Sequence, residues 1–273
     1  MNLQPAKKHE SVTILMVPHD GYSAFPRAVD AVMRETRLPF ELIIVEGASP
    51  NNIRHELEKR KERRKNVKII YSNHRPRMAE AFNLGLPHIR TCRAFLMHND
   101  VRVTPQWLEN LIQHATGKPG VICPYMAEEQ GEPLPKEGWE PTLHGFLVDK
   151  EVLAKLGEFD TKIAAPLLGV DLGQWLKKHH ITVHKDPYTV LEDASQGKLN
   201  SFDMKLFHRQ WDEKTIRESL VYVNKKWGLN LSESKYMGWL QKKKYPPLWP
   251  ELPEHPAFPK ISLKRFLQVL HRA

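Results

Sequence analysis

The chain has 273 residues, of which 41% are hydrophobic and 27% are charged. This length favours one domain with a large core, or one domain and an appendage, because single cores stop growing at roughly 250–300 residues. No stretch is both long and apolar enough for a transmembrane helix, so we do not expect this chain to be an integral membrane protein. The net charge of +9 favours phosphate-bearing substrates, anionic lipid surfaces or nucleic acid, without choosing among them.

The N-terminus and the cysteines indicate the compartment. The first residues, MNLQPAKK, lack the apolar segment of a secretory signal, so we expect a cytoplasmic protein. Cys92 and Cys123 show neither CxxC spacing nor a histidine cluster at zinc-finger spacing. We therefore expect both to be reduced thiols in the core.

Apolar runs alternate with helical patterns in the first part of the chain. Residues 11–17 and 40–45 are short apolar runs that predict buried strands, and residues 28–33 between them have helical spacing. Ser49 followed by Pro50 predicts the start of a helix through the charged segment 54–65. Residues 67–71 and 93–97 predict two further strands, with a helix over 78–89 between them.

The rest of the chain predicts a helix from residue 105, strands at 121–123, 145–148 and 181–184, and helices at 150–156 and 171–178. Residues 128–140 form a polar loop that we expect to act as a lid, with Trp139 as a candidate sugar platform. From residue 202 the pattern is helical, followed by a proline-rich linker (245–259) and a basic amphipathic helix (260–273). We expect a main domain over 1–200 and a helical extension over 201–273.

The alternation predicts an α/β fold with a mostly parallel, doubly wound sheet. In such sheets ligands bind beyond the carboxyl ends of the strands. Three polar segments follow predicted strands: Pro18-His19-Asp20, residues 46–49, and His98-Asn99-Asp100. We expect them to meet at one edge of the sheet.

The order of these segments resembles the GT-A glycosyltransferases, in particular the inverting, nucleotide-sugar-dependent glycosyltransferase family 2. The matching features are a strand ending in a proline, a second strand ending in an acid before a small-residue turn and a serine, an Ala-x-Asn-x-Gly helix, an element like the DxD motif, and a proline followed by an aromatic–leucine pair. In this sequence they are Pro18, Glu46 to Ser49, Ala81-Phe82-Asn83-Leu84-Gly85, His98-Asn99-Asp100, and Pro105-Gln106-Trp107-Leu108. Together they cover roughly residues 11–197.

The resemblance implies a Rossmann-like GT-A fold and an enzyme that moves a sugar from a nucleotide-diphosphate sugar to a hydroxyl acceptor with inversion. It implies a Mn²⁺ or Mg²⁺ ion held by Asp100, His98 and Glu192, because a divalent ion stabilises the departing diphosphate. It implies Asp171 as the general base that takes the proton of the acceptor hydroxyl. The residues expected to bind the nucleotide sugar are Pro18, His19, Glu46, Arg77, Asn99 and Asp100.

Two departures from the family pattern bear on these roles. His98 replaces the first aspartate of the DxD element, which leaves Asp100 as its carboxylate. The family's Glu-Asp-x-Asp near an acidic helix start, whose leading pair supplies the base, is Leu168-Gly169-Val170-Asp171 here. Only Asp171 matches in register.

Other interpretations stay open. Asp100 and Asp171 are each suited to capping a helix, and Glu192 to an ordinary surface position. His144 is either a sugar contact or a partly buried histidine with protein partners. A non-catalytic nucleotide-sugar or carbohydrate-binding protein on the same fold would explain both departures, and a nucleic-acid-binding protein is disfavoured because no reading motif is present.

The acceptor is expected to be a glycan, a lipid-linked molecule or another hydroxyl compound. The basic tail is suited either to peripheral contact with an anionic membrane at its inner face or to docking on the protein itself or on a second subunit of a homodimer.

Overall fold

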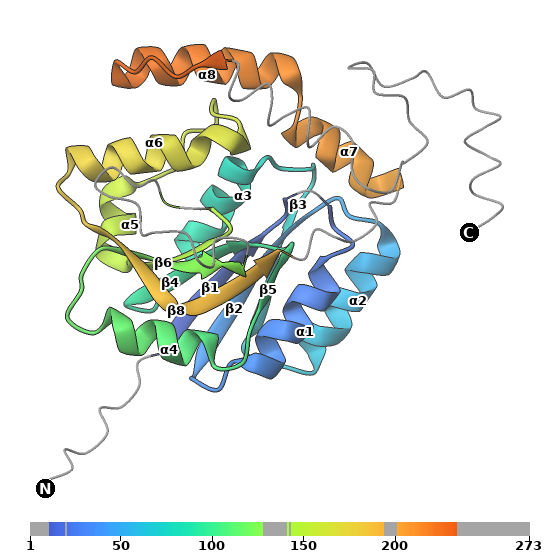
Figure 1. Ribbon diagram of the computed structural model, residues 1–273. Coiled ribbons are helices and arrows are strands. Elements are labelled where there is room, and N and C mark those ends of the chain that lie inside the picture. Colours follow the sequence, from blue (N-terminus) through green and yellow to red (C-terminus); the bar gives the residue numbers. More distant parts are fainter. Residues whose placement is uncertain (1–10, 20, 128–140, 142, 194–200, 234–273) are drawn as a thin grey trace, which may run out of the picture.

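Figure 1 shows the computed structural model, which describes residues 11–19, 21–127, 141, 143–193 and 201–233. Strands and helices alternate in its first half, as the sequence predicts. These elements are β1 (Val12–Val17), α1 (Phe25–Glu35), β2 (Phe40–Gly47), α2 (Asn51–Glu62), β3 (Val67–Ser72), α3 (Met78–Gly85), the 3-10 turn η1 (Leu86–His88) and β4 (Arg93–His98).

The second half completes one mixed sheet. Its elements are β5 (Val101–Val103), α4 (Trp107–Ala115), β6 (Val121–Met126), β7 (Gly145–Asp149), α5 (Lys150–Leu156), α6 (Ala165–Lys178) and β8 (Val183–Asp193). The strand order is β3-β2-β1-β4-β7-β6-β8-β5. β1 runs parallel to β2 and β4, whereas β7 runs antiparallel to β4 and β6. The predicted α/β class is confirmed, with a parallel first half.

The side chains of β1 alternate between two buried cores, one on each face of the sheet. Ile14 and Met16 pack with α1 and α4, whereas Leu15 and Val17 pack with α3 and α6. A strand buried on both faces has no polar alternation, which is why the sequence shows a continuous apolar run there.

The two cysteines differ in burial. Cys123 lies on β6 in the second core, whereas Cys92 is exposed in the turn before β4. The prediction that both lie in the core is therefore right for Cys123 and wrong for Cys92, because the apolar run of β4 begins only after it.

Two helices follow, α7 (Ser201–Gln210) and α8 (Glu213–Trp227), and both pack on the α/β unit. Leu206 joins the first core, and Leu220 and Val223 join the second. These contacts tie residues 201–233 to the main sheet, while the predicted division at residue 200 stays a prediction. The predicted lid (128–140), the linker (245–259) and the tail helix (260–273) lie outside the described residues.

Two predicted helix starts are wrong. α6 begins at Ala165 instead of at Asp171. Its first turn contains a proline, which fits there because the main-chain N–H groups of a first turn have no partner within the helix. Ser49 does not cap α2: Pro50 occupies the cap position, and the main-chain N–H of Ser49 donates to Glu46 Oε1 at 2.6 Å.

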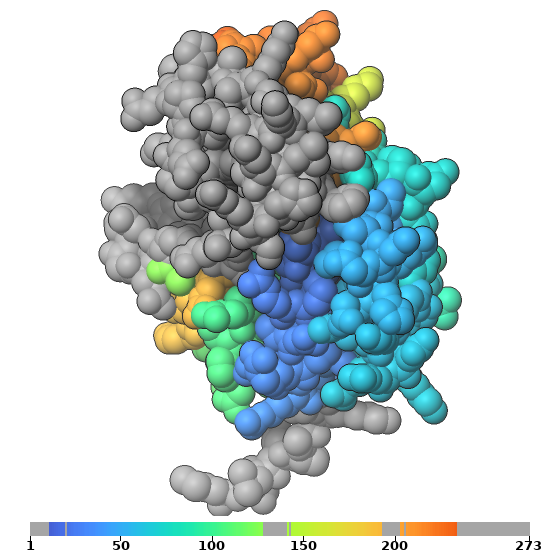
Figure 2. Space-filling model, turned by 90° about the vertical axis from the view of Figure 1, so that its right-hand side faces the viewer, coloured from blue at the N-terminus to red at the C-terminus, as the bar shows by residue number. Residues whose placement is uncertain are grey.

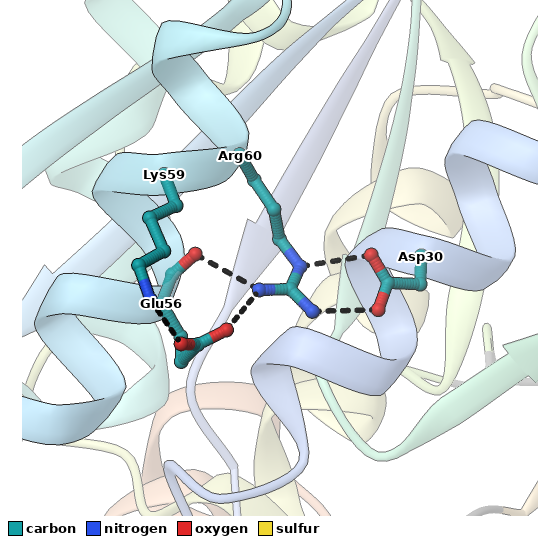
Figure 3. Close-up of polar contacts among 4 residues, drawn as sticks. All are labelled: Asp30, Glu56, Lys59 and Arg60. Atoms are coloured by element: carbon teal, nitrogen blue, oxygen red, sulfur yellow. Dashed lines mark hydrogen bonds and ion pairs between the residues drawn. The ribbon is translucent and has the colours of Figure 1, made fainter.

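An ion-pair cluster joins α1 to α2 (Figure 3). Arg60 donates through Nε to Asp30 Oδ1 at 2.8 Å and through Nη2 to Asp30 Oδ2 at 2.6 Å. Its remaining nitrogen, Nη1, donates to Glu56 Oε2, which lies one helical turn away on α2. Both helices contribute to the continuous blue and light-blue part of the surface in Figure 2. Every charged group in this cluster has a protein partner, which is typical of a structural contact.

Candidate active site

The site lies where β1 and β4 end side by side. The two strands are parallel, and their register places Val17 opposite His98. Pro18 and His19 therefore emerge beside His98, Asn99 and Asp100. Since β1 has β2 on one side and β4 on the other, this is the switch point of the parallel half-sheet, where α/β proteins bind ligands.

His19, His98 and Asp100 form one buried cluster. The carboxylate lies between the two rings: His19 Nδ1 is 2.8 Å from Asp100 Oδ2, and His98 Nδ1 contacts Asp100 Oδ1. The two imidazole rings are stacked, with centroids 4.3 Å apart and planes 16° apart. One potential metal-ligand atom from each residue lies within 4.8 Å of the others. This is the one such group of histidine, cysteine or acidic residues found in the described part of the chain.

Asn99 fixes the loop that carries His19. Its side-chain Oδ1 accepts a hydrogen bond from the His19 main-chain N–H at 3.0 Å, and its Nδ2 donates to the Gly21 carbonyl. Its own main-chain N–H donates to the Val17 carbonyl at 3.0 Å. Both polar atoms of this fully buried amide are thus used to hold the loop after β1.

Helix α7 anchors the same loop from the far end of the chain. Asp203 is buried and accepts hydrogen bonds from the main-chain N–H groups of Tyr22 and Ser23 and from the Ser23 hydroxyl. Gly21 is needed for this approach, since a Cβ there would lie 2.5 Å from Asp203 Cγ. Trp211, just after α7, presents its ring edge-on to His19 with centroids 5.8 Å apart.

Glu46 lies at the end of β2, and one of its carboxylate oxygens accepts no hydrogen bond. The residue is 1% exposed, and its Oε1 accepts from the Ser49 N–H, whereas Oε2 accepts no hydrogen bond and lies 3.9 Å from Arg54 Nε. Burial raises the pKa of Tyr22 well above its ordinary value, and the Glu46 carboxylate raises it further. Tyr22 is therefore a neutral donor, and its hydroxyl bonds to the Gly47 carbonyl.

Two arginines lie on the segment that packs against this turn. A Cβ on Gly47 would lie 2.2 Å from Pro76 Cδ, so the glycine lets the segment approach. Arg75 Nε and Arg77 Nε are buried without a hydrogen-bond partner. Arg77 also donates through Nη2 to Thr215 Oγ1 at 3.3 Å, which links it to α8.

Asp171 lies within α6 and is held by α8. Its Oδ1 accepts from Trp227 Nε1 at 2.7 Å and from Lys226 Nζ at 2.8 Å. Lys226 Nζ also lies 2.9 Å from Asp160 Oδ2, so one ammonium bridges two carboxylates. At Gly169, which matches the aspartate of the family's leading acidic pair, a Cβ would lie 2.9 Å from the Pro141 carbonyl oxygen. The chain therefore leaves little room for a side chain at that position.

Glu192 lies on β8 opposite Arg102 of β5, and the two side chains form an ion pair. It does not belong to the His19–His98–Asp100 cluster. The expected metal role of Glu192 stays a prediction, and its contact with Arg102 weighs against it.

Three further residues lie near this site, and the sequence singles out only His144 among them. His144 precedes β7, and its ring lies 4.9 Å from that of His98, centroid to centroid. Asp203 and Trp211 come from the helical sequence far along the chain. A helix pattern shows which residues are buried, but not which loop they contact.

One protein family and several solved structures resemble this chain. The model of the family described as "Glycosyl transferase family 2" matches residues 13–215. Among solved structures, the chain is similar to the mannosyltransferase PcManGT from Pyrobaculum calidifontis in complex with GDP-Man and Mn²⁺, with a TM-score of 0.58 and 14% identity over 87% of this chain and 81% of that chain.

It is also similar to GalNAc-T7 with UDP, GalNAc and Mn²⁺, with a TM-score of 0.56 and 12% identity over 87% of this chain and 59% of that chain. No curated protein sequence matches. Within the described residues, no helix is long and apolar enough to cross a membrane. The family match covers most of the chain, and the chain therefore belongs to glycosyl transferase family 2.

Proposed function

We propose that this glycosyltransferase moves a sugar from a nucleoside diphosphate sugar to a hydroxyl acceptor, with inversion and with help from a divalent ion. The observation that carries the proposal is the buried His19–His98–Asp100 cluster at the switch point, with Glu46, whose Oε2 accepts no hydrogen bond, at the end of the neighbouring strand β2. Both similar structures named above contain Mn²⁺ with a nucleotide or a nucleotide sugar, which supports this donor class.

The residues of the cluster fit a metal ion. A carboxylate and two imidazoles are all common ligands of divalent ions, and their potential ligand atoms lie within 4.8 Å of one another. Asp100 and His98 are thus suited to hold the ion against the diphosphate. When bound, such an ion acts as a Lewis acid for the charge that grows on the leaving diphosphate.

Other residues would bind and orient the donor. Glu46 Oε2 is suited to accept a hydrogen bond from the nucleotide base or the ribose. Pro18 is suited to form the floor under the base, whereas His19, expected beside it there, turns its ring toward Asp100. Arg77 is the proposed partner of the diphosphate or the sugar, and its Nε, which has no hydrogen-bond partner, supports this role. Asn99 contributes by holding the His19 loop, because both of its polar side-chain atoms already bond to main chain.

Asp171 is the proposed general base. In transfer with inversion, the acceptor oxygen bonds to the anomeric carbon while the bond from that carbon to the phosphate oxygen breaks, and the hydroxyl proton passes to a carboxylate. Trp227 and Lys226 both bond to Oδ1, which fixes the orientation of the carboxylate and leaves Oδ2 for the proton.

Identity of the donor and place of action stay predictions. The two similar structures hold a guanosine and a uridine nucleotide, so the base is open. A glycan, a lipid-linked molecule or another hydroxyl compound is the proposed acceptor. The proposed cytoplasmic location comes from the N-terminal sequence. Peripheral membrane contact and a homodimer depend on the tail (260–273), which lies outside the described residues.

The test is a thermal-shift screen of UDP-, GDP-, dTDP- and CMP-sugars with and without Mn²⁺, on the full chain and on Asp100→Ala. We expect one nucleotide to raise the melting temperature only with the metal, and the effect to disappear in the variant. Asp30→Ala is the matched control, because Asp30 is half exposed and pairs with Arg60 away from the site. No response to any nucleotide would overturn the proposal.

A second candidate is a nucleotide-sugar-binding protein without transferase activity. The crowded Gly169 favours it, since the family's leading acidic pair has no counterpart there. Product analysis distinguishes the two functions: metal-dependent binding without donor hydrolysis or transfer to any acceptor supports the binding protein.

A further inference from the structure

We propose that His19 is a third metal ligand, and that the resulting pair of imidazoles makes the site select first-row transition ions over Mg²⁺. This inference rests on the proposed metal site at Asp100 and goes beyond it in two respects. It adds a ligand from the loop after β1, and it decides between ion classes that the DxD-like element alone leaves open.

The first argument is the convergence of the ligand atoms. Both histidines turn the same ring nitrogen, Nδ1, toward the one carboxylate, His19 to Oδ2 and His98 to Oδ1. Two ligands that each lie about 2.1 Å from one ion cannot be farther apart than about 4.2 Å. The three ligand atoms lie within 4.8 Å of one another, so shifts of a few tenths of an ångström would complete the set.

The second argument is burial. The side chains of His19, His98 and Asp100 are 10%, 4% and 5% exposed. A carboxylate and two imidazoles are costly to bury unless their charges and lone pairs are used. An ion at this point would use all three, in place of the ring hydrogens that meet the carboxylate in its absence.

The third argument is that the His19 loop is already in position. Its main-chain N–H is bonded to Asn99 Oδ1, and the loop is held from the other side by Asp203. The rings of His19 and His98 are stacked, which restricts their rotation. A ligand fixed in advance loses little conformational entropy when it binds an ion.

The choice of ion follows from the donor atoms. Mg²⁺ prefers six oxygen ligands and loses its water reluctantly, whereas imidazole suits transition ions. Affinity at a nitrogen-containing site rises from Mn²⁺ toward Co²⁺ and stays high for Zn²⁺. Three protein ligands also leave positions open for phosphate oxygens, as catalytic metal sites require.

The test titrates the full chain with Co²⁺ alone and records both the heat of binding and the visible absorption spectrum. We expect one tight site in the wild type, and competition by Zn²⁺ and Mn²⁺ but only by about 100-fold more Mg²⁺. His19→Gln should weaken Co²⁺ binding by about 100-fold and change the spectrum, as should His98→Gln. His114→Gln is the matched control for adventitious binding, because His114 lies on α4 and bonds to the Asn110 carbonyl.

A readout on the wild type guards against a variant that fails to fold. Pulsed electron paramagnetic resonance on Mn²⁺-loaded protein counts coordinated imidazole nitrogens, and we expect two. One nitrogen, or unchanged Co²⁺ affinity in folded His19→Gln, overturns the role of His19, and equal competition by Mg²⁺ overturns the selectivity. If Asp100→Asn also keeps full Co²⁺ affinity, the metal part of the proposed function fails, which is a different result from failure at His19 alone.

Discussion

Asp100 and Asp171 are two buried carboxylates in one α/β unit, and their neighbours differ in kind. Asp100 meets two imidazoles, which can exchange a ring hydrogen for a metal ion. Asp171 meets an indole N–H and an ammonium, which can only donate. The partners of a buried carboxylate therefore indicate its role better than burial does: the first set is suited to an exchangeable ligand, the second to a fixed orientation.

Asp100→Asn should give the largest effect on activity. We expect metal-dependent transfer to fall by about 100-fold or more, because the amide is a poor ligand for a divalent ion. Unfolding free energy in the absence of metal should stay the same or rise, since a buried charge is removed. Steady-state kinetics and urea unfolding measure the two quantities, and a variant that still transfers at the wild-type rate would place the metal elsewhere.

Asp171→Asn tests whether Asp171 acts as the general base or has a structural role only. If Asp171 is the base, turnover should fall by about 100- to 10,000-fold while Mn²⁺ affinity is unchanged. Single-turnover kinetics with calorimetric metal titration check this. Retained turnover together with a lower melting temperature would assign Asp171 a structural role only.

Lys226→Met tests the network that holds Asp171. Side-chain exposure is 28% for Lys226 and 12% for Asp171, so the loss of the ammonium should cost about 2 kcal/mol of unfolding free energy. Lys214→Met is the control, because the Lys214–Glu218 pair has exposures of 85% and 66% and should change stability by less than about 0.5 kcal/mol. Equal effects in urea unfolding would contradict the difference between the two pairs.

The same network predicts a pH window. Burial raises the pKa of Asp160, but hydrogen bonds from Lys226, the Lys162 N–H and Tyr222 outweigh it, so the net pKa lies below the ordinary 3.8. Burial lowers the pKa of Lys226, but its bonds to Asp171 and Asp160 outweigh that and raise it above 10.5.

Asp160 therefore contributes stability that is complete above pH 3.8 and is lost as the pH falls through its folded pKa. Lys226 contributes stability that is complete below pH 10.5 and is lost as the pH rises through its folded pKa. The stability difference between wild type and Lys226→Met should be constant from roughly pH 5 to 9 and shrink outside this range. Urea unfolding at acidic, neutral and alkaline pH measures this stability difference. A difference that grows in acid would contradict the expected decrease.

Gln210→Met should give the smallest effect, and it tests a buried group that has neither kind of partner. Both polar atoms of the Gln210 side chain are buried without a hydrogen bond, and the residue is 2% exposed. Replacing the amide by a thioether of similar size should raise the unfolding free energy by about 1 kcal/mol in the absence of ligand. A loss of stability in thermal unfolding would show that the amide is paired in solution.

The sequence predicts the parallel half-sheet and its functional edge because that information is local. β1, β2 and β4 are continuous apolar runs, and each leads directly into polar residues such as His98, Asn99 and Asp100. Parallel order then brings those ends together. The start of α6 is not predicted by the sequence pattern, although Pro166 lies in its first turn, where a proline is compatible with a helix.

The partners of these residues are not local, and the sequence does not contain them in readable form. His19 bonds to a carboxylate 81 residues away, and Tyr22 bonds to Asp203 across 181 residues. Asp171 matches the family in register, but the sequence gives no sign that Lys226 and Trp227 of α8 would hold it. Such pairings depend on how helices pack, which periodicity does not specify.

The contact between Asp203 and the loop after β1 also sets an order for biosynthesis. The strands that end at the site leave the ribosome early, but the carboxylate that anchors the His19 loop is made only when α7 is translated. A nascent or prematurely terminated chain that stops before α7 therefore carries all three proposed ligands without the helix that holds one of them. Metal loading should consequently be a late event, coupled to release of the C-terminal helices from the ribosome.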